Sequence, residues 1–245
     1  IADSQDLDPN GYGPRIWVPP DGLSPRMQMT IFTAPNPDRD SDMESAVIVH
    51  EYGHGVSTRL VGGPSNVDSL SAQQSGAMGE GWSDYFSLAF TQKPTDGMND
   101  SYYIGSYVTN NPAGIRKYPY SFDLVADPRS YGDYNTSPEV HDAGEIWGSA
   151  LWDLHWLLIQ RYGFSPADGS GNPGIMAGYN PAHPYGNTLS MQLVLDSMKL
   201  MPVSPTFLDG RDAMLQADQL LTGGQNRDLI WTAFARRGMG IFAED

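Results

Sequence analysis

Two histidines four residues apart, with a glutamate directly after the first, constrain the fold of this chain more than any other feature. They form the segment His-Glu-Tyr-Gly-His at positions 50–54, directly after the apolar run Ala46–Val49. In an α-helix, residues i and i+4 lie on one face about one turn apart. We therefore predict a helix that points the imidazoles of His50 and His54 at a single metal ion.

The residue types in this segment suit zinc (Zn2+). Zinc in proteins is bound by His, Cys and carboxylate groups, and this chain contains no cysteine. Two histidines and a glutamate are also costly to bury without a partner. The spacing therefore predicts His50 and His54 as two ligands, with Glu51 beside the ion as a carboxylate base and not as a ligand.

The third ligand is expected from a second segment, Gly-Glu-Gly-Trp-Ser-Asp at positions 79–84. Glu80 lies far enough beyond His54 for a loop and an antiparallel second helix to return to the ion. Asp84 follows one turn later on the same face. A zinc-bound histidine usually donates its other ring N–H to a carboxylate, and Asp84 could accept it from His50. The alternative is a solvated pair at a helix start, which the glycines and tryptophan nearby disfavour.

The amino-acid composition restricts the classes of partner that this chain can bind. A net charge of −15 argues against nucleic acid and anionic membranes, since binding phosphate requires clustered Lys and Arg. No apolar run approaches the roughly 20 residues of a membrane span. Some of the 29 acidic residues could bind calcium (Ca2+), although no calcium loop of known spacing is present. The chain starts at Ile1 without a signal peptide, so we expect a processed or cut product.

Hydrophobic periodicity predicts a mainly helical chain. Residues 1–26 are rich in Pro, Gly and Asp and are expected to be irregular, whereas residues 27–32 alternate like a strand. A capping box at residues 41–44 predicts a helix that runs to about residue 60 and stops at the Gly-Gly-Pro of residues 62–64. Short strands are expected near residues 102–107 and 115–118, and further helices over residues 76–90, 138–162, 188–201, 208–221 and 226–237.

Motifs along nearly the whole chain point to one family. Besides the two segments above, which lie between Asp42 and Phe90, they are Pro19–Gly22, Ser57–Leu60, Gly114–Ser121, Asp209–Ala213, Gly223–Asn226 and Ala233–Gly238. Together they resemble the fungalysin family of secreted zinc endopeptidases. The resemblance implies zinc held by His50, His54 and Glu80, with Glu51 as general base. It also implies a thermolysin-like (gluzincin) arrangement, with the motif helix at the floor of a cleft between two lobes.

The resemblance also implies how catalysis proceeds. Zinc lowers the pKa of a bound water, and Glu51 takes its proton as the water attacks a peptide carbonyl. The resulting oxyanion needs a second electrophile. Residues 140–146 resemble the segment that supplies a histidine for this purpose, and His141 is assigned to it. The alternative is a solvent-facing histidine at a helix start.

Several other polar residues have open assignments. Glu145 could orient His141 or bind a second ion. Tyr118 and Tyr120 could donate to the oxyanion, although core packing is the simpler expectation. His155 and His183 are further candidates for the third ligand. We expect His155 to be packed in a helix interface, since it lies among tryptophans, and a histidine between prolines such as His183 to lie on a surface loop.

The expected fold is α+β and mainly α: a thermolysin-like zincin with a helical C-terminal lobe and only the end of a strand-rich N-terminal lobe. Residues 1–40 would be the remnant of that lobe and a connector, and residues 41–245 the helical zinc-peptidase lobe with the active-site helix. The family's asparagine-rich strand edge is replaced here by residues 11–17. Expected partners are a protein or peptide substrate and an upstream strand-rich lobe or propeptide as a separate chain.

The favoured function is a secreted, extracellular zinc endopeptidase that hydrolyses internal peptide bonds of proteins. One alternative is a non-catalytic zinc-binding or interaction domain derived from such a peptidase, which the shortened start keeps open. A zinc aminopeptidase is a weaker alternative, because no glycine-rich exopeptidase signature with a companion glutamate precedes the motif.

Overall fold

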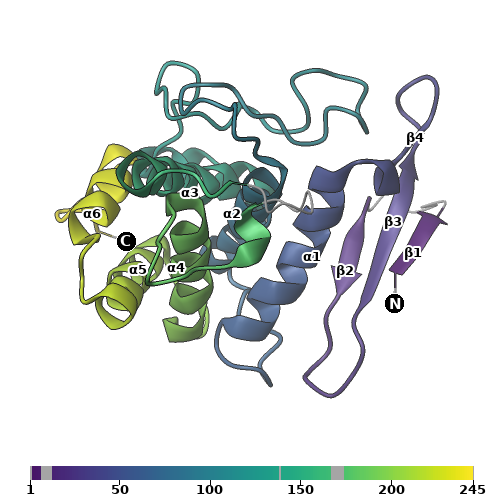
Figure 1. Ribbon diagram of the computed structural model, residues 1–245. Helices are drawn as coiled ribbons and strands as arrows, with labels where there is room; N and C mark the ends of the chain where they lie inside the picture. Colours follow the sequence, from purple (N-terminus) through teal and green to yellow (C-terminus); the bar gives the residue numbers. More distant parts are fainter. Residues whose placement is uncertain (1, 7–12, 138, 167–173, 245) are drawn as a thin grey trace.

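Strands gather at one end of the molecule and helices occupy the rest (Figure 1). The computed structural model describes residues 2–6, 13–137, 139–166 and 174–244. The mainly helical α+β fold predicted from the sequence is confirmed. Its elements in these ranges are the strands β1 (Ala2–Asp6), β2 (Arg15–Trp17), β3 (Arg26–Phe32) and β4 (Arg39–Asp40), the α-helices α1 (Ser45–Leu60), α2 (Gln73–Thr91), α3 (Val140–Tyr162), α4 (Gly186–Leu200), α5 (Phe207–Thr222) and α6 (Arg227–Arg236), and the 3-10 helices η1 (Ser41–Met43), η2 (Tyr131–Thr136) and η3 (Gly174–Ala177).

The sheet is built around β3, which confirms the strand predicted at residues 27–32. β1 runs parallel to β3 on one side, and β2 runs antiparallel to it on the other. β4 pairs with the end of β3, with Ile31 opposite Asp40. The prediction that residues 1–26 are irregular is therefore wrong for β1 and β2. Their pairing depends on backbone hydrogen bonds to β3, which no local pattern reveals.

The capping box predicted before the motif helix is also wrong. The hydroxyl of Ser41 accepts a hydrogen bond from the backbone N–H of Thr30 at 2.9 Å. The carboxylate of Glu44 accepts one from the backbone N–H of Val108, also at 2.9 Å. α1 starts at Ser45 without a side-chain cap. The two side chains instead tie the start of α1 to β3 and to the long connection between α2 and α3.

α2 and α3 pack along each other at the centre of the core, and α1 lies between α2 and the sheet (Figure 1). Trp82 and Trp147 meet edge to face, with ring centroids 5.8 Å apart. The backbones approach closely where glycines meet: a Cβ added to Gly81 would lie 2.5 Å from the carbonyl oxygen of Gly144. Only glycine permits this distance, so the two glycines set how near α3 comes to the α2 residues beside them.

The connection between α2 and α3 runs along one side of the helices (Figure 1). The strands predicted near residues 102–107 and 115–118 are wrong, since residues 102–118 form turns and bends, and Tyr102 forms an antiparallel bridge with Tyr120. The predicted stop at Gly163 is confirmed, with a φ of 78° at the end of α3. None of the described helices is long and apolar enough to cross a membrane.

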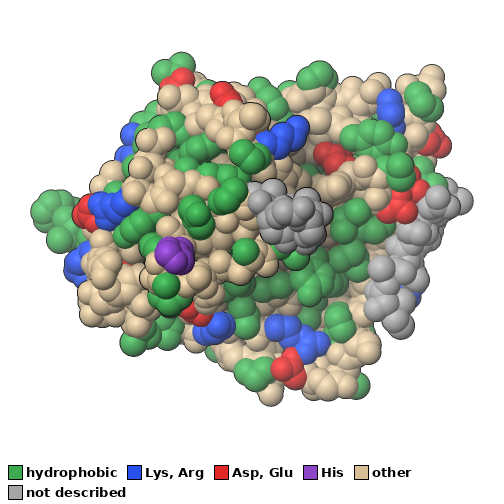
Figure 2. All heavy atoms as spheres, viewed as in Figure 1, with side chains coloured by type: hydrophobic (Ala, Val, Ile, Leu, Met, Phe, Trp, Pro, Cys, Tyr) green, Lys and Arg blue, Asp and Glu red, His purple; other side chains and the backbone are tan. Residues whose placement is uncertain are grey.

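α1 has two different faces. One face borders an apolar cavity of about 420 Å³ formed with α2, α4 and β3, and hydrophobic side chains gather over this part of the surface (Figure 2). The other face carries His50, Glu51 and His54 and borders a second, more polar cavity of about 490 Å³. The motif helix is thus packed on apolar residues on one side and presents its ionisable residues on the other.

Candidate metal centre

Three side chains from α1 and α2 converge at the polar cavity. The Nε2 atom of His50 lies 3.1 Å from Nε2 of His54 and 3.2 Å from one carboxylate oxygen of Glu80. Nε2 of His54 lies 3.5 Å from the other oxygen of Glu80. Ligand atoms about 2.0–2.1 Å from a tetrahedral zinc ion are about 3.3 Å apart. The three groups therefore have the spacing of zinc ligands around one centre, and among the described residues they form the only such cluster of His, Cys, Asp and Glu.

The electrostatics of the cluster favour a positive charge at its centre. Burial opposes a charge on His50, but hydrogen bonds to Asp84 and Glu80 raise its pKa to about 9. Burial lowers the pKa of His54 to about 4. Burial acts against the ionised form of Glu80, yet the histidines around it lower its pKa to about 2. Two imidazoles and an ionised carboxylate facing one another are the donor set that a zinc ion takes, so the residues present fit that ion.

Glu51 lies next to this cluster without joining it. Its side chain is buried, and it borders both the polar cavity and a smaller one of about 150 Å³ that also contains His50 and His141. Burial is the main cause that raises its pKa to about 7, although the charge of His50 opposes the shift. A bound cation would lower this pKa again. A carboxylate in this range beside an open cavity has the properties of a general base.

Asp84 lies behind His50, as predicted from the helix spacing. Its Oδ1 accepts hydrogen bonds from Nδ1 of His50 at 2.7 Å and from Arg116 at 2.8 Å. Its Oδ2 accepts from Arg116 at 2.6 Å and from the hydroxyl of Tyr120 at 2.5 Å. Burial opposes ionisation, but the guanidinium of Arg116 holds the pKa of Asp84 well below its usual range. Since Asp84 accepts the Nδ1 proton, Nε2 is the nitrogen of His50 that would bind a metal.

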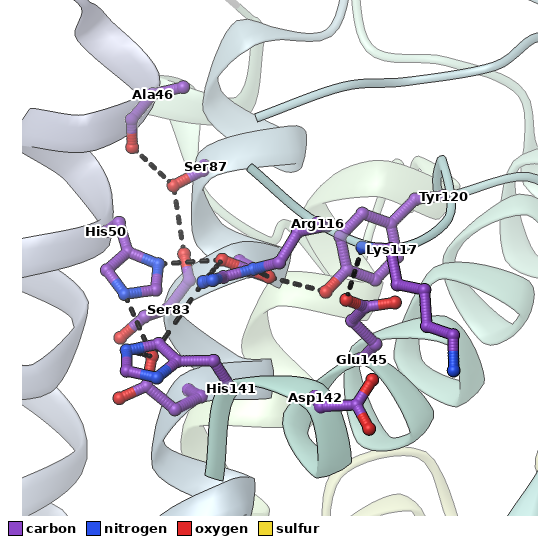
Figure 3. Close-up of polar contacts among 12 residues, drawn as sticks. Ala46, His50, Ser83, Ser87, Arg116, Lys117, Tyr120, His141, Asp142 and Glu145 are labelled. Carbon is purple, nitrogen blue, oxygen red and sulfur yellow. Dashed lines mark hydrogen bonds and ion pairs between the residues drawn. The ribbon is translucent and has the colours of Figure 1, made fainter. Parts of the chain in front are cut away.

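Arg116 was not predicted as a residue of the site. Its side chain is nearly buried and comes from the connection between α2 and α3, as Figure 3 shows. It also approaches Glu80, with 3.8 Å between the guanidinium and the carboxylate. The available signal was its place in the segment Gly114–Ser121, which contributed to the family resemblance. Nothing in the local pattern connects that segment with Asp84.

His141 reaches the same cavity from the first turn of α3. Its ring is half-exposed, and Nε2 lies 3.3 Å from a carboxylate oxygen of Glu80. Its Nδ1 lies 2.6 Å from one oxygen of Glu139, the residue that caps α3. The other oxygen of Glu139 accepts the backbone N–H groups of His141 and Asp142, at 2.9 and 3.0 Å. Glu139 thus caps the helix and holds the ring, and the sequence reasoning missed it.

Glu145, whose assignment the sequence left open between orienting His141 and binding a second ion, contacts the connection between α2 and α3. It is buried and accepts a hydrogen bond from the backbone N–H of Lys117 at 2.8 Å (Figure 3). It accepts a second from the backbone N–H of Tyr118 at 3.3 Å. Burial raises its pKa to about 7 against these hydrogen bonds and the charge of Arg129. The side chain therefore anchors the connection that carries Arg116, and the carboxylate that lies on Nδ1 of His141 is that of Glu139.

The remaining candidates lie away from the cluster. Tyr120 is fully buried, as core packing predicts, with its hydroxyl on Asp84 and not in the cavity. His155 is buried on α3, where it stacks on Trp152 with ring centroids 4.8 Å apart. His183 lies exposed in a turn. No second cluster of three metal-ligating side chains occurs in the described ranges, so calcium stays an untested prediction.

Comparison with known proteins gives a consistent result. Residues 5–243 match the fungalysin metallopeptidase family. The chain is 46% identical over 232 residues to an extracellular metalloproteinase MEP of Pyricularia oryzae, which covers 93% of this chain and 35% of that protein. It is 45% identical over 227 residues to extracellular metalloproteinase 3 of Trichophyton soudanense, with 93% and 56% covered. The chain thus spans about a third to about half of these relatives.

A solved structure has the same fold. The precursor of protealysin, a metalloproteinase from Serratia proteamaculans, superposes with a TM-score of 0.59 at 16% sequence identity. The match covers 88% of this chain and 63% of that one. At this identity the similarity concerns the fold alone, and it agrees with the thermolysin-like arrangement expected from the sequence.

Proposed function

This chain belongs to the fungalysin family of metallopeptidases, and we propose on that basis that it cleaves internal peptide bonds of proteins outside the cell. The proposed site consists of a zinc ion on His50, His54 and Glu80, with Glu51 as the general base. One observation carries the proposal: three ligand atoms, one each from His50, His54 and Glu80, lie within 4.8 Å of one another beside Glu51 in an open cavity. The names of the relatives, extracellular metalloproteinases, support the secreted location.

In the proposed reaction, the metal ion and the side chains of the protein have separate roles. When bound, zinc acidifies a water molecule and polarises the scissile carbonyl. Glu51 then takes a proton from the attacking water at a carboxylate oxygen and passes it to the leaving amine. Asp84 holds the Nδ1 proton of His50 throughout, so that Nε2 stays available as a ligand.

His141 is the proposed electrophile for the oxyanion. Carboxylate oxygens of Glu139 and Glu80 lie near its two ring nitrogens, and such oxygens can only accept hydrogen bonds. Glu139 therefore keeps a proton on Nδ1 and holds the ring at the edge of the cavity. When the ring also carries a proton on Nε2, as an imidazolium, that N–H can donate to the negative charge that develops on the substrate carbonyl.

We also propose that the strands before residue 41 belong to a strand-rich lobe and that residues 41–245 form the helical lobe. The position of all four described strands before residue 41 supports this division. A protein or peptide is the proposed substrate. An upstream lobe or a propeptide as a separate partner chain stays a prediction.

The test compares the wild type with Glu51→Gln. Glutamine keeps the size of the side chain but cannot take a proton, so we expect zinc content to be retained and protein hydrolysis to fall by about 10²–10⁴-fold. A chelator should abolish hydrolysis by the wild type, and added zinc should restore it. Full activity of Glu51→Gln would refute the role of Glu51. Zinc binding without any cleavage of internal bonds would instead favour the non-catalytic alternative.

A further inference from the structure

We infer that Tyr120 is a positioning residue of the metal centre, because it holds the carboxylate that orients His50. The inference rests on the zinc site proposed above. Tyr120 is fully buried in the connection between α2 and α3 and borders neither cavity beside Glu51. Tyr120 contacts the residues of the site through its hydroxyl, which donates a hydrogen bond to Oδ2 of Asp84 at 2.5 Å. The side chains of His50, Arg116 and Tyr120 point toward one another (Figure 3), and all three form hydrogen bonds with Asp84.

The hydrogen bonds on Asp84 show why the hydroxyl matters. Each carboxylate oxygen accepts two donors: Oδ1 from His50 and Arg116, and Oδ2 from Arg116 and Tyr120. Rotation of the carboxylate would carry Oδ1 away from His50. Arg116 restrains that rotation from one side and Tyr120 from another. Because Asp84 is only 1% exposed, water cannot replace a lost donor without rearrangement.

The ring of Tyr120 is itself held in place. A Cβ added to Gly148 of α3 would lie 2.9 Å from the Cε1 atom and from the hydroxyl oxygen of Tyr120. The backbone N–H and carbonyl of Tyr120 pair with Tyr102, at 2.9 and 3.0 Å. The glycine thus provides the space that lets the hydroxyl reach Asp84. A continuous series of contacts runs from Gly148 in α3 through Tyr120 and Asp84 to His50 in α1.

A neighbouring tyrosine provides a matched control. Tyr85 follows Asp84 directly on α2 and is also fully buried. Its hydroxyl hydrogen-bonds to Ser190 at 2.8 Å and to His155 at 3.2 Å, away from the metal ligands. Replacing either tyrosine by phenylalanine removes one buried hydroxyl and leaves its partners a hydrogen bond short. The two changes should therefore be similar in their cost to folding and different in their effect on zinc.

The experiment measures zinc affinity by competition with a chelator for the wild type, Tyr120→Phe and Tyr85→Phe. Residues behind a metal ligand typically change metal affinity by 10–100-fold, and we expect about tenfold weaker binding for Tyr120→Phe. Tyr85→Phe should stay within twofold of the wild type. Thermal unfolding of the metal-free proteins reports the structural cost of each change. With Co2+ in place of zinc, the visible spectrum of Tyr120→Phe should differ from that of the wild type, because the His50 ring is less well held.

A second variant changes the residue of α3 that lies against the ring of Tyr120. Gly148→Ala keeps the hydroxyl but displaces the ring, so it should also weaken zinc binding. Wild-type affinity in both Tyr120→Phe and Gly148→Ala would overturn the inference, as would equal losses in Tyr120→Phe and Tyr85→Phe. If the proposed zinc site itself is wrong, the result is different: the wild type would not bind zinc stoichiometrically. That result would remove the metal centre and this inference with it.

Discussion

Gly144 of α3 is the position where one added carbon atom should disturb the metal centre most. A Cβ at this residue would lie 2.6 Å from the Cβ of Glu80 and 2.9 Å from the carbonyl oxygen of Ala77. Neither neighbour is the mobile end of a side chain. Carbon atoms in contact prefer about 3.5–4.0 Å, so Gly144→Ala should push α2 and α3 apart by about 1 Å at Glu80.

The substitution Gly144→Ala should change the free energy of unfolding little, because its two contributions have opposite signs, but it should weaken zinc binding. Alanine in a helix is favoured over glycine by about 1 kcal/mol, whereas overpacking costs about 1–3 kcal/mol. The net loss of about 0–2 kcal/mol is a small part of a typical stability of about 5–15 kcal/mol. A displacement of about 1 Å, however, is half the length of a zinc–ligand bond of about 2 Å. We therefore expect zinc affinity to fall at least tenfold while the fold persists.

Chelator competition and thermal unfolding, measured on the same samples, separate these two effects. Gly79→Ala is the matched control on α2, because a Cβ there would meet nothing closer than Leu70 at 3.6 Å. It should gain the alanine preference and keep wild-type zinc affinity. If Gly144→Ala is stabilised as much as Gly79→Ala and binds zinc equally well, the close approach of α2 and α3 does not position Glu80 as argued here.

Three further predictions concern the surroundings of the site. Glu139→Ser keeps a helix-capping oxygen but cannot reach the ring of His141, so kcat should fall about tenfold or more with zinc affinity and thermal stability unchanged; an unchanged kcat would contradict the role of Glu139. Burial lowers the pKa of His155 from 6.5 to about 3. Between pH 6.5 and pH 3 the unfolded chain binds a proton on His155 and the folded chain does not. The contribution of His155 to the free energy of unfolding is therefore fully retained above pH 6.5 and is lost as the pH falls toward 3. The loss is about 2 kcal/mol at pH 5, and urea unfolding of His155→Gln should lack it; an equal loss in the variant would contradict the assignment. Arg237 is fully buried and forms two hydrogen bonds with Asp153, both at 2.9 Å. Arg237→Met should destabilise the protein by about 3–5 kcal/mol, measured by urea unfolding, since the buried carboxylate of Asp153 loses both of these hydrogen bonds and keeps a longer contact of 3.3 Å to Arg236.

Much of the metal centre follows from helix periodicity. His50 and His54 share a helix face at any tertiary arrangement, and so do Glu80 and Asp84. Helix geometry depends on residues within four positions of each other, so these pairs are visible in the chain before it folds. The length of the intervening loop and the family resemblance both suggested that the two pairs meet, and in the structure they lie together.

Other parts of the centre depend on partners distant in sequence. Arg116 meets Asp84 across 32 residues, and Tyr120 reaches it across 36. None of these contacts has a periodic signature, because each is determined by how a loop crosses a helix. The roles of Ser41 and Glu44 in anchoring α1 belong to the same class.

Glu139 is an instructive intermediate case. It lies two residues before His141, so the chain itself keeps the two groups close. Whether the carboxylate meets the ring depends on where α3 begins, and Glu139 itself caps that start. The amino-acid order therefore specified which groups are available and which share a helix face. Tertiary packing decided which of them meet, because close approaches such as that of Gly81 and Gly144 exist only once two helices are pressed together.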